Sequence, residues 1–143
     1  MFHPKAIFRI IGFLLLFEAL SLLSCIPVAL YYGEPTEYLL LSVAAMVVSG
    51  SFFAYIYRKA GRNVSRKDGY IVVTVIWIIF SLFGSLPYML SGYIPSFTDA
   101  FYETMSGFTT TGSSILSNIE SLPRSLLFWR SLTHWIGGLG IVF

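Results

Sequence analysis

The sequence predicts an all-α polytopic membrane protein, with two N-terminal transmembrane helices followed by one helix–pore loop–helix unit. Three observations lead to this fold class. Only 11% of the 143 residues are charged and the mean hydropathy is +0.76, whereas a soluble domain carries roughly 25% charged residues. Three apolar runs are each about 20 residues or longer, enough to cross the hydrocarbon core of a bilayer. A short polar segment rich in threonine and glycine then interrupts the apolar pattern.

The apolar runs define the predicted spans in chain order. The first, 7–31, follows a basic N-terminus, is too long for a signal peptide and is not followed by a cleavage motif, so we expect a retained signal-anchor helix. The second and third spans are predicted at 38–57 and 70–90. A fourth helix is expected over 125–143. Because its apolar pattern continues to the last residue, we expect a truncated chain. The single cysteine, Cys25, excludes a disulfide framework.

The basic residues orient these spans. Seven of the nine Lys and Arg residues lie before the first run or between the second and third: Lys5, Arg9, Arg58, Lys59, Arg62, Arg66 and Lys67. The connection 32–37 has none. The positive-inside rule therefore predicts that the N-terminus and the 58–67 loop are cytoplasmic. Contact of this loop with anionic lipid or with a cytosolic subunit is the alternative role.

The segment between the third and fourth runs has the pattern of a re-entrant loop. Ser96 and Asp99 have the spacing of a capping box, which predicts the start of a helix over 97–108. That helix would be about 18 Å long, roughly half a bilayer. The threonines 109–111 and Gly112 end it, because β-branched residues and glycine favour other backbone conformations. The alternative is a polar external loop with an amphipathic helix lying on the membrane surface.

Extended backbone at membrane depth needs partners for its carbonyl groups. A dehydrated K⁺ ion is one such partner, and a short helix directs the negative end of its dipole toward it. The predicted ligands are the backbone carbonyls of Thr110, Thr111, Gly112 and Ser113. The sequence TTGSS at 110–114 resembles a relaxed form of the potassium-channel filter TVGYG, with Ser113 at the tyrosine position and Ser114 at the last glycine.

The flanking sequences extend this resemblance. DAFYETMSGFTTTG at 99–112, followed by LFWRSLTHWIGGLG at 127–140, resembles the first pore repeat of the Trk/Ktr potassium transporter superfamily, and the two leading helices resemble its TrkH branch. The resemblance divides the chain into leading helices, 1–62, and a repeat of the potassium-channel type, 63–143. Within the repeat it implies a helix at 70–90, a pore helix at 97–108, a filter at 109–114 and a second helix at 125–143.

The resemblance also implies a function and partners. One family chain holds four such repeats around one pore, so this chain would supply one quarter of a selectivity filter for potassium uptake. The transported ion is potassium, the membrane is the bacterial inner membrane, and no nucleic-acid partner or enzymatic activity is expected. A homodimer and a cytosolic nucleotide-binding regulatory subunit of the TrkA type are implied for the full-length protein.

Three alternatives follow from the residues. Four copies of this chain would complete a homotetrameric cation channel. An intramembrane hydrolase would use Ser113 or Ser114 as nucleophile and His134 as base, but no third orienting residue is evident. A membrane-anchor subunit without transport activity would not need a half-length helix ending in a filter-like segment.

Several polar residues in the predicted membrane region have open roles. Glu18, in the first span, is expected to be structural, with a hydrogen bond to Ser21 or to a neighbouring helix, although a charge in a span is a functional candidate. Asp99 and Glu103 either attract cations to the pore mouth, or Asp99 caps the helix and Glu103 pairs with Arg124 or Arg130. For His134 a packing role is favoured, and for the glycines at 137, 138 and 140, close helix packing beside the pore.

Overall fold

The computed structural model describes residues 4–61 and 64–142, and all regular structure in this part of the chain is helical. The elements are α1 (Pro4–Leu23), α2 (Cys25–Tyr31), α3 (Glu37–Ile56), α4 (Arg66–Gly84), α5 (Leu86–Leu90), α6 (Phe97–Phe108), the 3-10 turn η1 (Ile119–Ser121) and α7 (Arg124–Val142). The predicted fold class, an all-α membrane protein, is confirmed. Arg62 and Phe143, which entered the sequence predictions, lie outside the described residues.

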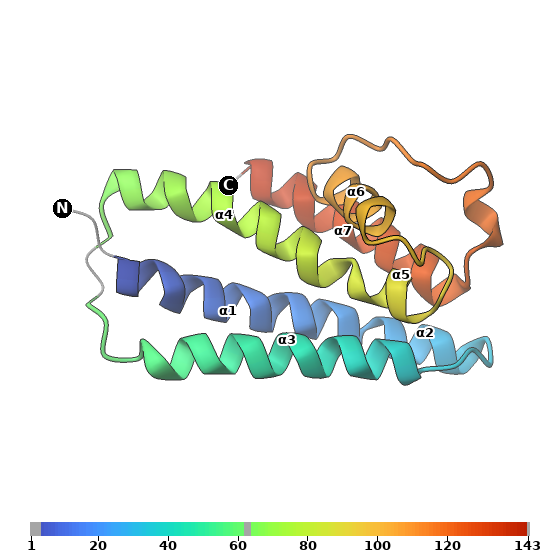
Figure 1. Cartoon of the computed structure of the whole chain (residues 1–143), viewed down its shortest axis with the longest axis horizontal. Coiled ribbons are helices and arrows are strands. Elements are labelled where there is room, and N and C mark those ends of the chain that lie inside the picture. Colours follow the sequence, from blue (N-terminus) through green and yellow to red (C-terminus); the bar gives the residue numbers. More distant parts are fainter. Residues whose placement is uncertain (1–3, 62–63, 143) are drawn as a thin grey trace.

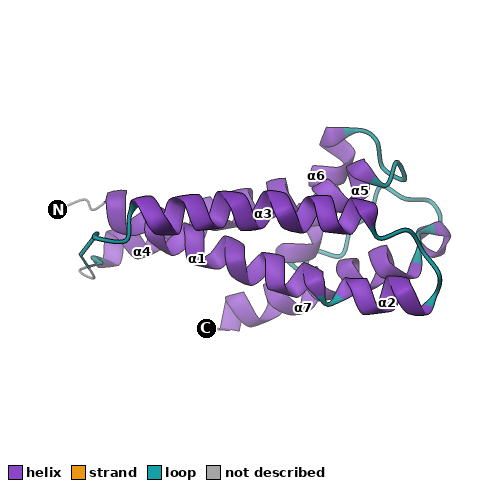
Figure 2. Cartoon of the chain, turned by 90° about the horizontal axis from the view of Figure 1, so that it is seen from below, coloured by secondary structure: helices purple, strands orange, loops and turns teal. Residues whose placement is uncertain are grey.

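The helices form a bundle of long, roughly parallel rods with one short helix crossing them. Helices α1, α3 and α4 run along the long axis, whereas α6 is seen nearly end-on in Figure 1. The start of α1 and the α3–α4 connection lie at one end of the bundle, and the α2–α3 loop, α5 and the start of α7 lie at the other (Figures 1 and 2). The two segments that carry most of the basic residues, the start of α1 and the α3–α4 connection, therefore lie at the same end of the bundle.

Three helical segments among the described residues are long and apolar enough to cross a membrane: Pro4–Tyr31, Glu37–Ile56 and Arg66–Leu90. They correspond to the three predicted apolar spans. Helix α7 covers nearly the whole fourth predicted run but is not among the three. Its sequence includes Arg124, Arg130 and His134, which lower its apolar character.

Two predicted spans are each broken once near a proline. Ser24 separates α1 from α2 and Ser85 separates α4 from α5, two or three residues before Pro27 and Pro87. Proline has no backbone N–H and its ring clashes with the preceding turn, so the helix ladder cannot continue unchanged through these positions. Pro87 lies in the first turn of α5, where a missing N–H costs nothing.

The helix starts differ from the predicted capping. Ser96 precedes α6 but makes no side-chain capping hydrogen bond, so the predicted box with Asp99 is wrong, and Asp99 is exposed. A complete capping box occurs at α4 instead: Asp68 N–H donates to Ser65 Oγ at 3.2 Å, and Ser65 N–H donates to Asp68 Oδ2 at 3.0 Å. Sequence reasoning missed this Ser-x-x-Asp pattern directly before the third apolar run.

The leading helices pack against each other backbone to backbone. A Cβ atom added to Gly12 of α1 would lie 2.7 Å from Ala54 N and 2.8 Å from Gly50 O, both on α3. At the far end of this pair, the carboxylate of Glu34 accepts hydrogen bonds from the N–H groups of Arg124 (2.5 Å) and Ser125 (3.0 Å). The loop between the leading helices therefore caps the N-terminus of α7.

Candidate functional site

The candidate site begins where α6 ends. Phe108 is fully buried, and its ring lies 5.3 Å from that of Phe80 and 6.4 Å from that of Trp129, measured between centroids. The indole of Trp129 donates a hydrogen bond to the Gly84 carbonyl at 3.0 Å. Aromatic packing from α4 and α7 thus fixes the C-terminal end of the short helix.

Helix α6 closes with a Schellman-type motif in which threonine takes the usual glycine position. The Thr110 N–H donates to the Gly107 carbonyl and the Thr111 N–H to the Ser106 carbonyl, both at 2.9 Å. Thr110 has φ 57°, and it is the one non-glycine residue with positive φ among the described residues. A β-branched residue in this region is an outlier that costs about 1–2 kcal/mol. Such strain concentrates at functional positions.

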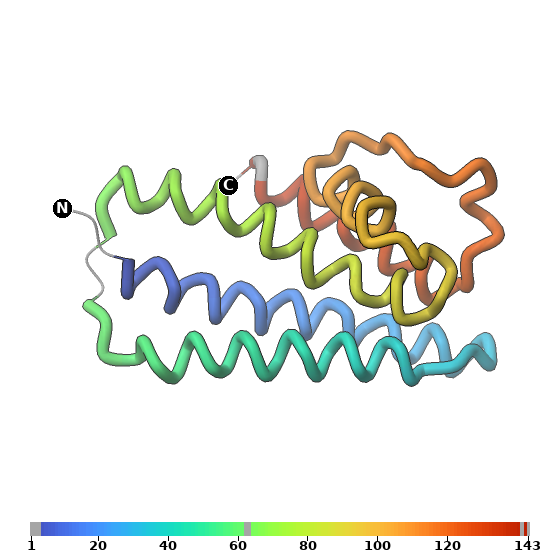
Figure 3. The backbone as a smooth tube through the Cα atoms, in the orientation of Figure 1, coloured from blue at the N-terminus to red at the C-terminus, as the bar shows by residue number. Residues whose placement is uncertain are grey.

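The predicted filter segment, 109–114, follows directly and contains no helix or strand. Gly112 has φ 75°, and residues 109–113 are exposed. Figure 3 shows residues 109–123 leaving α6, arching along one side and returning to the start of α7. The segment therefore lies on the surface of this chain and not in its core.

The carbonyl groups of the segment fall into two sets. Within the described residues, no hydrogen bond reaches the carbonyl oxygens of Thr110, Thr111 and Gly112. The Ser113 carbonyl instead accepts a hydrogen bond from Ser106 Oγ at 2.5 Å, and the Thr109 carbonyl accepts one from Thr110 Oγ1 at 2.7 Å. Three consecutive carbonyls are therefore available to an external partner.

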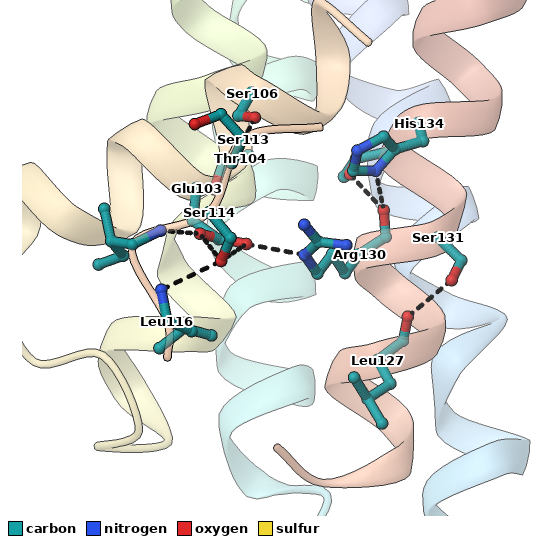
Figure 4. Close-up of polar contacts among 12 residues, drawn as sticks. Glu103, Thr104, Ser106, Ser113, Ser114, Leu116, Leu127, Arg130, Ser131 and His134 are labelled. Atoms are coloured by element: carbon teal, nitrogen blue, oxygen red, sulfur yellow. Dashed lines mark hydrogen bonds and ion pairs between the residues drawn. The ribbon is translucent and has the colours of Figure 1, made fainter. Parts of the chain in front are cut away.

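Side chains of α6 and α7 lie beside the last two residues of the segment, Ser113 and Ser114 (Figure 4). Glu103 of α6 is buried and forms an ion pair with Arg130 of α7, with 2.7 Å between Oε1 and Nε. It also accepts hydrogen bonds from Ser114 and Ile115. Of the two roles predicted for Glu103, pairing with Arg130 is the one that the structure contains.

The serine and histidine of the hydrolase alternative have other partners. The hydroxyl of Ser113 bonds to the hydroxyl of Tyr102 at 2.7 Å, and that of Ser114 donates to Glu103. The Nδ1 atom of His134 lies 2.8 Å from the Arg130 carbonyl, one turn earlier on α7, and therefore donates to it. In the described part of the chain no hydrogen bond joins His134 to either serine.

Glu18 is fully buried in α1, and neither carboxylate oxygen has a hydrogen-bond partner among the described residues. The suggested bond to Ser21 is absent there, because Ser21 Oγ donates to the Phe17 carbonyl at 3.0 Å. A Cβ atom added to Gly84 would lie 2.9 Å from Glu18 Oε1 and 2.8 Å from Thr104 Cγ2. Glu18 thus lies behind α6, at the α4–α5 break.

The predicted close packing of the α7 glycines is present at Gly137 and Gly140. A Cβ atom on Gly137 would collide with the backbone carbonyl of Phe108, and one on Gly140 would lie 3.1 Å from the Trp77 ring. Gly138 has only a distant neighbour, with Thr110 Cγ2 at 3.9 Å. Gly137 therefore lets α7 approach the last residue of α6.

The described residues form a helical fold with three segments long and apolar enough to cross a membrane, which defines the class of polytopic helical membrane proteins. The model of the TrkH family, described as cation transport protein, matches residues 38–143, and the chain belongs to this family. This confirms the resemblance stated from the sequence.

Known relatives cover nearly the whole chain. It is 34% identical over 140 residues to the Trk system potassium uptake protein TrkH of Halomonas elongata, and 32% identical over 142 residues to the Trk system potassium uptake protein TrkG of Escherichia coli K12. The crystal structure of the potassium transporter TrkH from Vibrio parahaemolyticus matches with a TM-score of 0.91 and 30% identity over 99% of this chain. The chain spans 29% of the length of each sequence relative and 31% of the solved chain.

Proposed function

We propose that this chain is the part of a potassium uptake protein that contributes one quarter of its selectivity filter. The backbone carbonyls of Thr110, Thr111 and Gly112 would bind the passing K⁺ ion, with Ser113 as the fourth predicted ligand. The leading helices would occupy 1–62 and the first pore repeat 63–143. Potassium is the transported ion and not a resident cofactor.

The observation that carries this proposal is the backbone after α6. Thr110 adopts a left-handed backbone conformation that is unfavourable for a β-branched residue. The carbonyls of Thr110, Thr111 and Gly112 have no hydrogen-bond partner in the described chain. Carbonyl groups of this kind replace the hydration shell of K⁺ in channel filters. The Ser113 carbonyl, which already accepts a bond from Ser106, would use its second lone pair for the ion.

The electrostatics of α6 support a cation at this position. The helix has 12 residues, and its C-terminal end leads directly into the filter segment. The negative end of a helix dipole stabilises positive charge, and the effect is confined to the last turn. Residues 110–112 begin two residues after the last residue of α6, so an ion held by them would lie near this end of the helix.

The relatives extend the proposal to the whole protein. Two of them are named as potassium uptake proteins and are about three times as long as this chain. Their length favours a pore built from several repeats of one chain over four copies of this one. A homodimer, a cytosolic nucleotide-binding subunit of the TrkA type and a bacterial inner membrane with the N-terminus inside belong to the same proposal.

The test is Gly112→Ser in the full-length protein, with Gly92→Ser as a matched control. Both glycines have positive φ, and a Cβ atom at either meets no other atom within 4 Å in this chain. Each substitution therefore brings a similar backbone cost of about 1–2 kcal/mol without a steric clash. We expect Gly112→Ser alone to reduce discrimination of Rb⁺ from Na⁺ in uptake assays at matched membrane abundance.

The opposite result is equally clear. If Gly112→Ser leaves both Rb⁺ affinity and Na⁺ exclusion as in the wild type, residue 112 does not line the ion path. The filter assignment would then be wrong. Equal losses of selectivity in both variants would point to a general distortion instead, and would also contradict the assignment.

A further inference from the structure

Glu103 is a buried carboxylate at which three segments of the chain meet (Figure 4). It lies in the middle of α6 and is 1% exposed. Its oxygens accept the Ser114 hydroxyl at 2.9 and 3.0 Å and the Ile115 N–H at 3.3 Å, and Oε1 pairs with Arg130 Nε at 2.7 Å. One side chain thus links α6, the loop after the filter segment and α7.

The ion pair neutralises the charge that these bonds require. The side chain of Glu103 is 0% exposed and that of Arg130 is 17% exposed. A carboxylate buried without a cation would be strongly unfavourable, whereas a paired one can accept charge-assisted hydrogen bonds. Arg130 therefore allows an ionised acceptor to lie behind the filter segment.

Ser114 connects this acceptor to the backbone. A hydroxyl has a single hydrogen, so Ser114 donates to one Glu103 oxygen at a time. Its own oxygen accepts the Leu116 N–H at 3.1 Å. The Ile115 N–H donates to Glu103 directly. The backbone at 114–116 is therefore held to one carboxylate twice, directly at Ile115 and through the Ser114 hydroxyl at Leu116.

Two other side chains of α6 hold Ser113, the residue before Ser114. Tyr102 bonds to the Ser113 hydroxyl at 2.7 Å, and Ser106 donates to the Ser113 carbonyl at 2.5 Å. At its other end, the segment is fixed by the helix-terminating bonds of Thr110 and Thr111. The three unpartnered carbonyls of residues 110–112 therefore lie between two anchored ends.

We propose that Glu103, neutralised by Arg130, is the positioning residue that fixes the outer end of the filter segment and thereby sets its ion selectivity. This inference rests on the proposed function. Moving the outer anchor changes the position of the carbonyls between the two ends, and selectivity depends on the placement and number of those oxygens. Glu103 acts through Ser114 and Ile115 and does not touch the ion.

This role differs from attraction of cations to the pore mouth. The charge of Glu103 is buried and already paired, whereas Asp99, one turn earlier on α6, is exposed and has no ion-pair or hydrogen-bond partner among the described residues. A mouth charge would raise the local concentration of Na⁺ and Rb⁺ alike. The two roles therefore predict different effects on the ratio of the two ions.

The experiment compares two variants with two controls in the full-length protein, at matched membrane abundance. Glu103→Gln keeps the size of the side chain but has one oxygen and an NH₂ group, so it cannot accept from Ser114, Ile115 and Arg130 together. Ser114→Ala removes one donor to Glu103 and the acceptor of the Leu116 N–H, and it keeps both partners of the ion pair. The controls are Asp99→Asn and Ser117→Ala, both at exposed positions without a hydrogen-bond partner among the described residues.

Initial rates of Rb⁺ and Na⁺ uptake are measured over a range of concentrations. We expect Glu103→Gln to lower the Rb⁺-to-Na⁺ ratio about tenfold, with a smaller decrease for Ser114→Ala, because buried bonds to a charged group are lost. The controls should keep the wild-type ratio, even where Asp99→Asn raises the KM of both ions. A purely structural role would lower abundance without changing the ratio per molecule.

The inference would be overturned if Ser114→Ala keeps the wild-type Rb⁺-to-Na⁺ ratio and Glu103→Gln either keeps that ratio too or only loses abundance. The proposed function would survive that result if Gly112→Ser still alters selectivity. If Gly112→Ser also leaves selectivity unchanged, the proposed function itself fails. The two failures are therefore distinguishable.

Discussion

At the scale of single residues, Glu18 and Glu103 show how differently two buried carboxylates can be treated. Glu103 accepts hydrogen bonds from three residues, Ser114, Ile115 and the cation Arg130, while Glu18 has no hydrogen-bond partner in the described chain. The sequence places Glu18 in an apolar span and Glu103 in a short helix near two candidate cations, but it does not show which carboxylate has a partner. Only the neighbours brought in by α7 and by the loop after α6 distinguish the two.

We expect Glu18→Met to keep ion uptake and to raise the thermal stability of the full-length protein. Methionine has a similar length and flexibility, and it removes a buried polar group that costs about 1–3 kcal/mol when it has no partner. Thermal unfolding in detergent and Rb⁺ uptake in cells are the measurements. Loss of uptake at normal membrane abundance would instead make Glu18 functional, contrary to the structural role favoured here.

At the scale of elements, the α6–α7 contact decides where the filter segment starts. Gly137 and Gly138 are adjacent on α7 but differ in their surroundings. A Cβ atom on Gly137 would collide with the Phe108 backbone, whereas one on Gly138 would meet only Thr110 Cγ2, 3.9 Å away. A collision with backbone cannot be relieved by a rotamer change, because one of the two helices must move. The two glycines therefore have unequal importance.

Gly137→Ala should lower the free energy of unfolding by about 1–3 kcal/mol and impair Rb⁺ uptake, because it displaces the end of α6. Gly138→Ala is the matched control and should resemble the wild type, since 3.9 Å is an ordinary contact distance. Thermal stability in detergent and uptake at matched abundance would be compared. Equal behaviour of the two variants would show that α7 does not pack on Phe108 in this way.

At the scale of the whole molecule, the two ends of the bundle differ in charge. Basic residues gather at the first end, around the start of α1 and the α3–α4 connection, whereas the α2–α3 loop at the other end contains none. Lys5 is in the first turn of α1, and Arg58 and Lys59 follow α3 at the first end, whereas Glu34 in the α2–α3 loop and Glu37, the first residue of α3, lie at the other end. The positive-inside rule predicts that the first end is cytoplasmic. The filter segment follows α5 and α6, and we infer that it is entered from the external side.

Cysteine labelling in intact cells tests this orientation. We expect an impermeant maleimide to label Glu37→Cys but not Lys59→Cys in the full-length protein, and both after permeabilisation, because both positions are exposed. Background from the native Cys25 should be small, since this residue is buried. Labelling of residue 59 but not 37 in intact cells would reverse the proposed topology.

Local patterns in the sequence determine a large part of this protein. Apolar runs longer than a bilayer is thick predict the spans, and Pro27 and Pro87 mark their breaks. The short helix over 97–108 and the positive φ of Gly112 are also predictable, because glycine and β-branched residues end helices through their own backbone preferences. These features depend only on neighbours along the chain.

The tertiary structure decides what depends on residues far apart in sequence. Glu103 could pair with Arg124 or Arg130, and only the packing of α7 on α6 brings Arg130 to it. The capping of α7 by Glu34, 90 residues earlier, is likewise absent from any local pattern. The Ser113 carbonyl, which the sequence predicts as an ion ligand, also accepts the hydroxyl of Ser106, because the chain folds back along α6 after the helix ends. Side-chain partners follow from how helices pack, and helix packing is a property of the folded chain.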